Sequence, residues 1–189
     1  SNLIFANNFK RHLIIEGSPA VIKNFREEHP DSNAEIKQDY FETFQTEEKF
    51  STIVMGFVLE HVDDPSTILQ KYKNYLSKNG SLFVAVPNAE SLNRRIGHEA
   101  GLLNNLENLS DYDKLLGHKR YFTVKSLTKL IHEAGYEAET IEGIYLKAIT
   151  TSQMNLLKLE KKVSDAFCSV GIDYPELSCA ILAELKIAK

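Results

Sequence analysis

Cysteine is scarce in this sequence, and its pattern excludes several classes of protein. Only Cys168 and Cys179 occur among 189 residues, both in apolar surroundings and without Cys-x-x-Cys spacing. This predicts two reduced core thiols of a cytoplasmic protein, and it excludes a disulfide framework or a cysteine-ligated metal site. Internal repeats and low-complexity linkers are absent from the sequence as well.

Basic blocks and long apolar runs are also absent. The charges are mixed, with a net charge of −4, and they do not indicate a nucleic-acid-binding surface. No apolar run reaches the roughly 20 residues that span a bilayer, and the first residues lack the layout of a signal peptide. The length suits one α/β domain with a substantial core. We therefore expect a single domain over 1–189, with neither a membrane nor a nucleic acid as partner.

Strand-like and helix-like segments alternate along the chain, which predicts an α/β fold with a mostly parallel sheet and helices on both faces. A Ser-Pro pair at 18–19 and an Asp-Pro pair at 64–65 each predict a helix start. The segment 50–56 is apolar almost throughout, as in a strand covered on both faces. Strands are expected at 11–16, 34–38, 50–56, 81–86, about 138–146 and about 179–185, and helices after Ser18, Asp64 and Thr123 and near 156–170.

Apolar spacing within the expected helices predicts their buried sides. Glycines are expected to end two of them, Gly80 the second helix and Gly135 the third. The inward residues should be Val21, Ile22 and Phe25 in the first helix, Ile68, Leu69, Tyr72 and Leu76 in the second, Leu127, Leu130, Ile131 and Ala134 in the third, and Leu156, Leu159, Val163, Phe167 and Val170 in the last.

One strand–helix–strand unit carries the strongest motif. The strand 50–56 leads into a turn with Glu60 and His61, a capped helix, and a second strand that ends in Pro87-Asn88. Later the chain reads Leu-Gly-His-Lys-Arg-Tyr-Phe-Thr over 116–123 and Ala-Gly-Tyr over 134–136. These segments resemble signatures of class I S-adenosylmethionine-dependent methyltransferases, with motifs IV and V in the first unit. The resemblance extends from Leu13 to about Met154.

The resemblance implies a Rossmann-like sheet with an antiparallel last strand. It also implies an enzyme that transfers the methyl group of S-adenosylmethionine to an oxygen or nitrogen of a small molecule and leaves S-adenosylhomocysteine. The alternative is a non-catalytic domain that keeps the fold but has lost the cofactor. The sequence leaves the methyl acceptor and the oligomeric state open.

Residues at the ends of the first two expected strands match the family's nucleoside contacts. Glu16, followed by Gly17 and Ser18, would accept hydrogen bonds from both ribose hydroxyls, with Ser18 beside the adenine. The plainer reading of Glu16 is a carboxylate at a helix N-terminus. Asp39 would take the adenine amino group, with Tyr40 next to the ring, although Gln38 replaces the family's glycine.

The third expected strand ends at the methionine end of the cofactor, where Met55, Gly56 and Phe57 are expected to contact it. Some relatives bind a divalent metal through Glu-x-x-Glu-His. Here Phe57 replaces the first glutamate of that pattern, so we expect no metal. Glu60 and His61 then cap and position the turn, and a role of His61 as general base stays open.

The segment 91–118 interrupts the alternation and is expected to form a cap. An insertion after this strand faces the ligand edge of an open α/β sheet, although a surface excursion without chemistry is an equal alternative. His118 and Tyr121 are the candidates for acceptor contact or proton removal. The equal alternative is that His118 and Arg120 tie the cap to the sheet.

The family's glycine-rich loop is missing from the sequence. It should lie roughly 20 residues before the ribose acid, which is upstream of Ser1. Leu3–Ala6 would then correspond to the end of the first crossover helix. We therefore expect a fragment of a longer chain, one that binds the cofactor weakly. Its exposed sheet edges would seek partners, and a homo-oligomer is one outcome.

Overall fold

The computed structural model describes residues 8–188, and the chain divides into two compact units. The first extends to Glu47 and the second begins at Glu48, and each has its own β-sheet. The predicted single domain over 1–189 stays a prediction. The expected helix end at Leu3–Ala6 lies outside the described residues.

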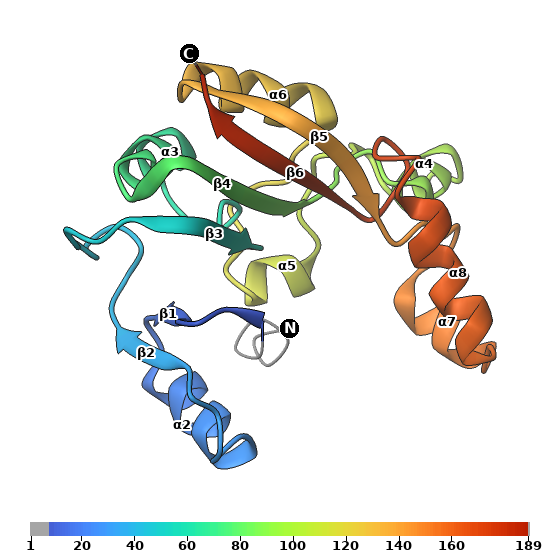
Figure 1. Ribbon diagram of the computed structural model, residues 1–189. Coiled ribbons are helices and arrows are strands. Elements are labelled where there is room, and N and C mark those ends of the chain that lie inside the picture. Colours follow the sequence, from blue (N-terminus) through green and yellow to red (C-terminus); the bar gives the residue numbers. More distant parts are fainter. Residues whose placement is uncertain (1–7, 189) are drawn as a thin grey trace. The chain divides into compact units, whose positions relative to one another are not determined.

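The first unit is a strand–helix–strand motif (Figure 1). Strand β1 (Leu13–Glu16) pairs in parallel with β2 (Glu35–Gln38), and helix α2 (Pro19–Glu28) connects them. The hydroxyl of Ser18 accepts the Val21 N–H at 3.4 Å, and proline opens the helix as predicted. Val21, expected to face inward, is exposed instead.

The second unit contains a four-stranded sheet in the order β3-β4-β6-β5 (Figure 1). Its strands are β3 (Phe50–Gly56), β4 (Leu76–Pro87), β5 (Tyr136–Ile144) and β6 (Ala180–Ile187). Strands β3 and β4 run parallel, whereas β6 is antiparallel to both of its neighbours. Three strands therefore share one direction and only the last is reversed, which confirms the predicted α/β fold class.

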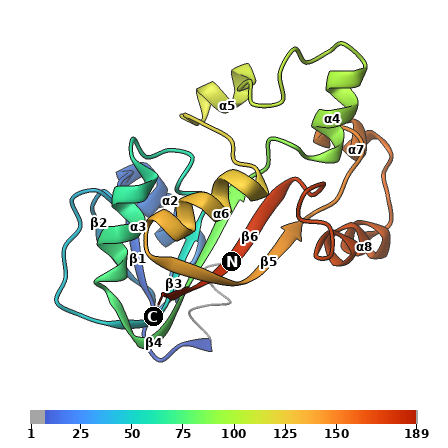
Figure 2. The ribbon, with the colours of Figure 1, turned by 90° about the horizontal axis from the view of Figure 1, so that it is seen from above.

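Helices α3 (Pro65–Lys73) and α6 (Val124–Glu133) lie over the same face of this sheet (Figure 2). Asp64 caps α3, and Thr123 caps α6 within a reciprocal capping box. Most of the inward residues predicted for these helices are buried, with Leu69, Leu127 and Ile131 fully buried. The core thus forms where their apolar sides meet the sheet.

The boundary between α3 and β4 differs from the prediction. The helix ends at Lys73, and Leu76, expected on its inner side, already pairs with Phe50 as the first residue of β4. Gly80, expected to stop the helix, lies within the strand. A Cβ atom there would come within 3.0 Å of the Phe50 carbonyl oxygen. Gly80 is therefore needed for close approach of two backbones.

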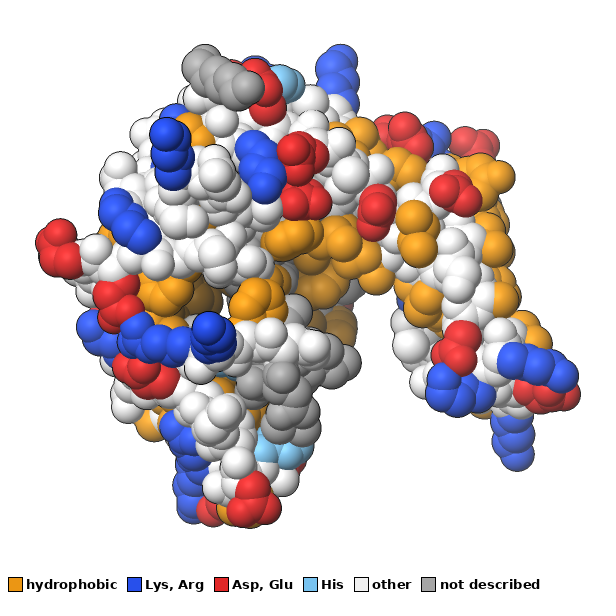
Figure 3. Space-filling view, viewed as in Figure 1, with side chains coloured by type: hydrophobic (Ala, Val, Ile, Leu, Met, Phe, Trp, Pro, Cys, Tyr) orange, Lys and Arg blue, Asp and Glu red, His pale blue; other side chains and the backbone are white. Residues whose placement is uncertain are grey.

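The expected helix near 156–170 is two helices, α7 (Thr151–Leu156) and α8 (Lys161–Gly171), separated by Lys158 with a positive φ of 47°. The predicted inward side is wrong for Leu156, Val163 and Val170, which are exposed. Figure 3 shows apolar side chains on the surface of this arm. Cys168 on α8 is also exposed and Cys179 only half-buried, so the core-thiol prediction fails for Cys168.

The segment 91–118 contains two short helices, α4 (Leu92–Glu99) and α5 (Asp111–Leu115). Ser110 caps α5 in a capping box with Asp113. Across residues 8–188, no helix has the length and apolarity that crossing a membrane requires.

Candidate functional site

The polar residues predicted to bind the nucleoside lie at the carboxyl end of the β1–β2 pair. Glu16 closes β1, and its carboxylate accepts the Ser18 N–H at 2.7 Å. This is the helix-start contact of the plainer reading, although a carboxylate can accept further hydrogen bonds. The Asp39 N–H donates to the Glu16 carbonyl at 3.2 Å, so the two acidic residues are joined by backbone.

Gly17 and Tyr40 are in close contact in the same place. A Cβ atom on Gly17 would lie 2.9 Å from the Tyr40 ring, so any other residue at this position would displace the ring. Asp39 accepts hydrogen bonds from the Tyr40 N–H at 2.8 Å and from the Thr43 hydroxyl at 2.6 Å. The Tyr40 side chain remains 67% exposed. The first unit therefore presents two carboxylates and an accessible aromatic ring together.

The residues predicted for the methionine end of the cofactor lie in the second unit, at the end of β3. Met55 is buried, whereas a Cβ atom on Gly56 would meet no atom within 4 Å. Phe57 adopts a positive φ of 59°, and its N–H donates to the Ala85 carbonyl at 2.8 Å. A left-handed phenylalanine is strained, and because this conformation is not that of a strand, β3 ends at Gly56.

Two segments far apart in sequence meet beyond this strand end, the turn at Glu60–Asp63 and the segment His118–Arg120. The Lys119 N–H donates to the Glu60 carbonyl at 2.8 Å, and the Arg120 guanidinium donates to the Asp63 carbonyl at 3.0 Å. The rings of His61 and His118 then meet edge to face, with centroids 4.8 Å apart. Arg120 thus ties this segment to the turn after β3, and the two predicted histidines lie together there.

Glu60, His61 and His118, which we call the Glu60 cluster, can bring one ligand atom each to within 4.8 Å of one another. Glu60 is fully buried, and neither of its carboxylate oxygens has a hydrogen-bond partner in the described part of the chain. Burial raises the pKa of Glu60 to about 7, although the nearby N–H of its own backbone, which makes no hydrogen bond of normal geometry to the carboxylate, acts in the opposite direction. The pKa of His118 is lowered, first by burial and then by His61.

Sequence reasoning missed this cluster. The expectation of no metal considered only the five consecutive residues 57–61, where Phe57 replaces a glutamate. The third group, His118, comes from a motif that sequence reasoning assigned to the acceptor. The available signal was the occurrence of two histidine-bearing motifs at the same edge of one predicted sheet.

A second polar cluster, the Arg94 cluster, consists of Arg94, Asp113 and Tyr121. The Tyr121 hydroxyl donates to the Asp113 carboxylate at 2.5 Å and accepts from Arg94 at 3.1 Å. The Arg94 guanidinium also stacks 4.1 Å from the centre of the Tyr121 ring. Burial and the Asp113 carboxylate raise the pKa of Tyr121. Its predicted acceptor role stays untested, but its hydroxyl is engaged on both sides.

Arg94 and Asp113 were not assigned roles from sequence, yet they organise the cap. Arg94 donates to the carbonyls of Leu106 and Asn108, each at 2.7 Å. Burial acts to raise the pKa of Asp113, but hydrogen bonds from Ser110 and Tyr121 prevail and lower it. Its other oxygen lies 3.5 Å from the His118 Nδ1. Asp113 therefore joins the two clusters.

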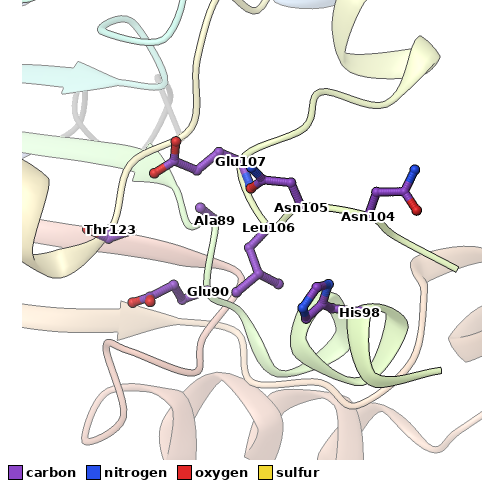
Figure 4. Close-up of a pocket in the computed structure, with 8 residues that line it drawn as sticks. All are labelled: Ala89, Glu90, His98, Asn104, Asn105, Leu106, Glu107 and Thr123. Atoms are coloured by element: carbon purple, nitrogen blue, oxygen red, sulfur yellow. The ribbon is translucent and has the colours of Figure 1, made fainter. Parts of the chain in front are cut away.

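A polar pocket of about 440 Å³ lies between the end of β4 and the cap (Figure 4). Its lining residues are Ala89, Glu90, His98, Asn104, Asn105, Leu106, Glu107 and Thr123. None of the predicted catalytic residues His61, His118 and Tyr121 is among them. Asn88 is buried and directly precedes Ala89 in the chain. Its side-chain NH₂ group donates to the carbonyls of Pro175, Glu176 and Ser178, and its side-chain oxygen accepts the Glu90 N–H. This amide holds the chain at the start of the pocket lining, next to Ala89 and Glu90.

Comparison with known proteins identifies the class of the chain. Residues 5–141 match the model of a family described as "Methyltransferase domain". No curated protein matches the sequence.

Several solved structures share the fold at low sequence identity. An S-adenosylmethionine-dependent methyltransferase from Mesorhizobium loti is 13% identical, with a TM-score of 0.62 over 93% of this chain and 79% of that one. One from Clostridium acetobutylicum ATCC 824 is 10% identical, with a TM-score of 0.61 over 98% and 78%. The N-methyltransferase NodS from Bradyrhizobium japonicum WM9, solved with S-adenosyl-L-homocysteine, is 15% identical, with a TM-score of 0.58 over 98% and 71%.

Proposed function

Since this chain belongs to the methyltransferase-domain family, we propose that it transfers the methyl group of S-adenosylmethionine to an oxygen or nitrogen of a small molecule. The observation that carries the proposal is the group of polar residues at the carboxyl end of the parallel β1–β2 pair. Ligands of open α/β sheets bind at this end of the strands. Glu16 and Asp39 supply the acceptors that ribose hydroxyls and an adenine amino group require.

We assign the proposed contacts to the ribose, the adenine and the methionine end of the cofactor. In the first unit, Glu16, Gly17 and Ser18 would contact the ribose, and Asp39 and Tyr40 the adenine. In the second unit, the chain at 55–57 would contact the methionine end, where the open surface at Gly56 suits close approach to backbone.

Methyl transfer needs little from the protein besides positioning, because the acceptor attacks the sulfonium methyl group in line. A base is needed only where the acceptor atom carries a proton. In this proposal His118 and His61 lie on the acceptor side. Tyr121 holds the cap in place, because its hydroxyl is committed to Asp113 and Arg94.

The cofactor site is tested by titrating the ¹⁵N-labelled protein with S-adenosylhomocysteine and following the backbone amide resonances. NMR suits the test because it detects weak as well as tight binding and assigns the response to single residues. The resonances of 16–18, 39–40 and 55–57 should shift. Glu16→Ala should weaken binding by roughly 1.5–3 kcal/mol, the range for a hydrogen bond to a charged group.

Glu27→Ala, on the exposed side of α2, is the matched control and should leave the affinity unchanged. Shifts confined to other residues, or equal affinity of the Glu16 and Glu27 variants, would contradict the assignment of the site. No shifts at any S-adenosylhomocysteine concentration would favour the alternative, a non-catalytic domain that has lost the cofactor. If the cofactor binds, methyl-labelled S-adenosylmethionine and a panel of small amines and phenols, analysed by mass spectrometry, test transfer itself.

A further inference from the structure

The buried carboxylate of Glu60 lacks a counterpart. Its residue is 0% exposed, and neither oxygen has a hydrogen-bond partner among residues 8–188. An unpaired buried charge costs several kcal/mol, and native proteins rarely leave such a group without a purpose. A bound cation would compensate for this cost.

Two imidazoles converge on the same point. Ligand atoms of His61 and His118 lie within 4.8 Å of one another and of a Glu60 oxygen. The backbone hydrogen bond from Lys119 to the Glu60 carbonyl, 2.8 Å long, holds the two segments together. The three groups are thus held by the fold itself, since neither segment could bring them together alone.

The surroundings of His118 provide a second, independent observation. Its Nδ1 faces the Asp113 carboxylate at 3.5 Å, and both side chains are nearly buried. The contact is longer than a hydrogen bond between these atoms would be, and with Nδ1 directed at Asp113 we assign Nε2 to the ligand. Metal-binding histidines commonly direct their other ring nitrogen at a carboxylate, which orients the ring and makes it a better ligand. Asp113 itself is fixed by Ser110 and Tyr121.

We propose that Glu60, His61 and His118 bind a divalent transition-metal ion, with Zn²⁺ as the best match. Two nitrogens and one oxygen suit Zn²⁺, Fe²⁺ or Co²⁺, whereas Mg²⁺ and Ca²⁺ prefer oxygen ligands throughout. Three protein ligands also leave a coordination position open, as in catalytic zinc sites. The proposal revises the sequence-based expectation of no metal, and binding of the ion does not depend on methyl transfer.

A histidine that binds the metal ion cannot at the same time act as a general base. When both histidines are ligands, neither can accept a proton from an acceptor. A water or hydroxyl group in the open position would instead have its pKa lowered by the ion. Whether the ion is bound therefore decides which group can accept the proton, a free histidine or a metal-bound hydroxide.

The test is calorimetric titration of the chelator-treated, dialysed protein with ZnCl₂, together with the visible absorption of Co²⁺ as a reporter of ligand geometry. One ion should bind per chain. Glu60→Gln and His118→Ala should each weaken Zn²⁺ binding at least about 10-fold, since even the loss of a group that only orients a ligand costs about 10–100-fold. Excess MgCl₂ should not displace Zn²⁺.

His98→Ala is the matched control, because His98 is an exposed cap histidine outside the cluster. It should bind Zn²⁺ like the unaltered protein. Glu60→Gln keeps the shape of the side chain, and circular dichroism will show whether each variant is folded. The proposal is overturned if Zn²⁺ does not saturate the unaltered protein, if the folded Glu60 and His118 variants bind it equally well, or if Mg²⁺ displaces it.

Discussion

The two polar clusters of the second unit lie next to each other, but they differ in how many of their polar groups have hydrogen-bond partners. In the Arg94 cluster, the Tyr121 hydroxyl has two partners and Arg94 donates to two further carbonyl groups. In the Glu60 cluster, the carboxylate has no hydrogen-bond partner among the described residues. A satisfied network stabilises the protein by itself, whereas an unsatisfied one has capacity left for a ligand. The Arg94 cluster therefore supports the cap, whereas the Glu60 cluster has polar groups available to bind a ligand.

Removing the centre of the satisfied cluster should have the largest effect on stability. Arg94→Ala deletes the hydrogen bonds to Leu106, Asn108 and Tyr121 and the contact with the Tyr121 ring. We expect the free energy of unfolding to fall by about 2–3 kcal/mol in urea denaturation. Arg95→Ala removes a partly exposed ion pair with Glu90 and one hydrogen bond to the Glu90 carbonyl, and it should cost about 1 kcal/mol. Equal losses in the two variants would show that the Arg94 cluster is not a stabilising network.

A smaller change should have an intermediate effect. Tyr121→Phe removes one hydroxyl, and Asp113 keeps its hydrogen bonds from Ser110. The expected loss in unfolding free energy is about 1–2 kcal/mol, in the lower part of the range for hydrogen bonds to charged groups. Tyr112→Phe, at an exposed position of α5, should change it by less than about 0.5 kcal/mol. A Tyr121→Phe protein as stable as the parent would contradict the contacts assigned to this hydroxyl.

The unsatisfied cluster should respond in the opposite direction. In metal-free protein, Glu60→Gln replaces a buried, unpartnered carboxyl group by a neutral amide of the same shape. Thermal and urea unfolding with a chelator present should show a gain of about 0.5–1 kcal/mol. Glu107→Gln, at an exposed position, should be neutral. A loss above about 1 kcal/mol at Glu60 would mean that its carboxylate already has a partner, and the contrast between the clusters would disappear.

Much of the fold could be predicted from the sequence, because local signals and burial agreed. Ser18, Asp64 and Thr123 cap the helices as expected, and β3 has the predicted bounds. The wrong predictions concern residues whose role depends on a contact with a part of the chain distant in sequence. Gly80 reads as a helix stop, yet its lack of a side chain allows β4 to approach Phe50. The apolar spacing near 156–170 predicted one buried helix, although most of these residues are exposed.

The candidate site was less predictable for a related reason. Strand ends and family motifs indicated Glu16, Asp39 and His118 one by one, since each lies in a recognisable local context. The Glu60 cluster depends on a backbone contact between Lys119 and Glu60, which no spacing along the chain can indicate. Whether Glu60 is paired or unpaired is likewise a property of the folded interior.

The position of β6 in the sheet also affects how the protein is made. This strand lies between β4 and β5, although it follows both in sequence. On the ribosome, β4 and β5 therefore wait with open edges until residues 180–187 emerge, and such edges pair readily with other chains. Synthesis that stalls before Ala180 would release a chain whose sheet lacks an inner strand. The edges of β4 and β5 that β6 covers in the folded protein thus stay unpaired throughout the translation of α7 and α8.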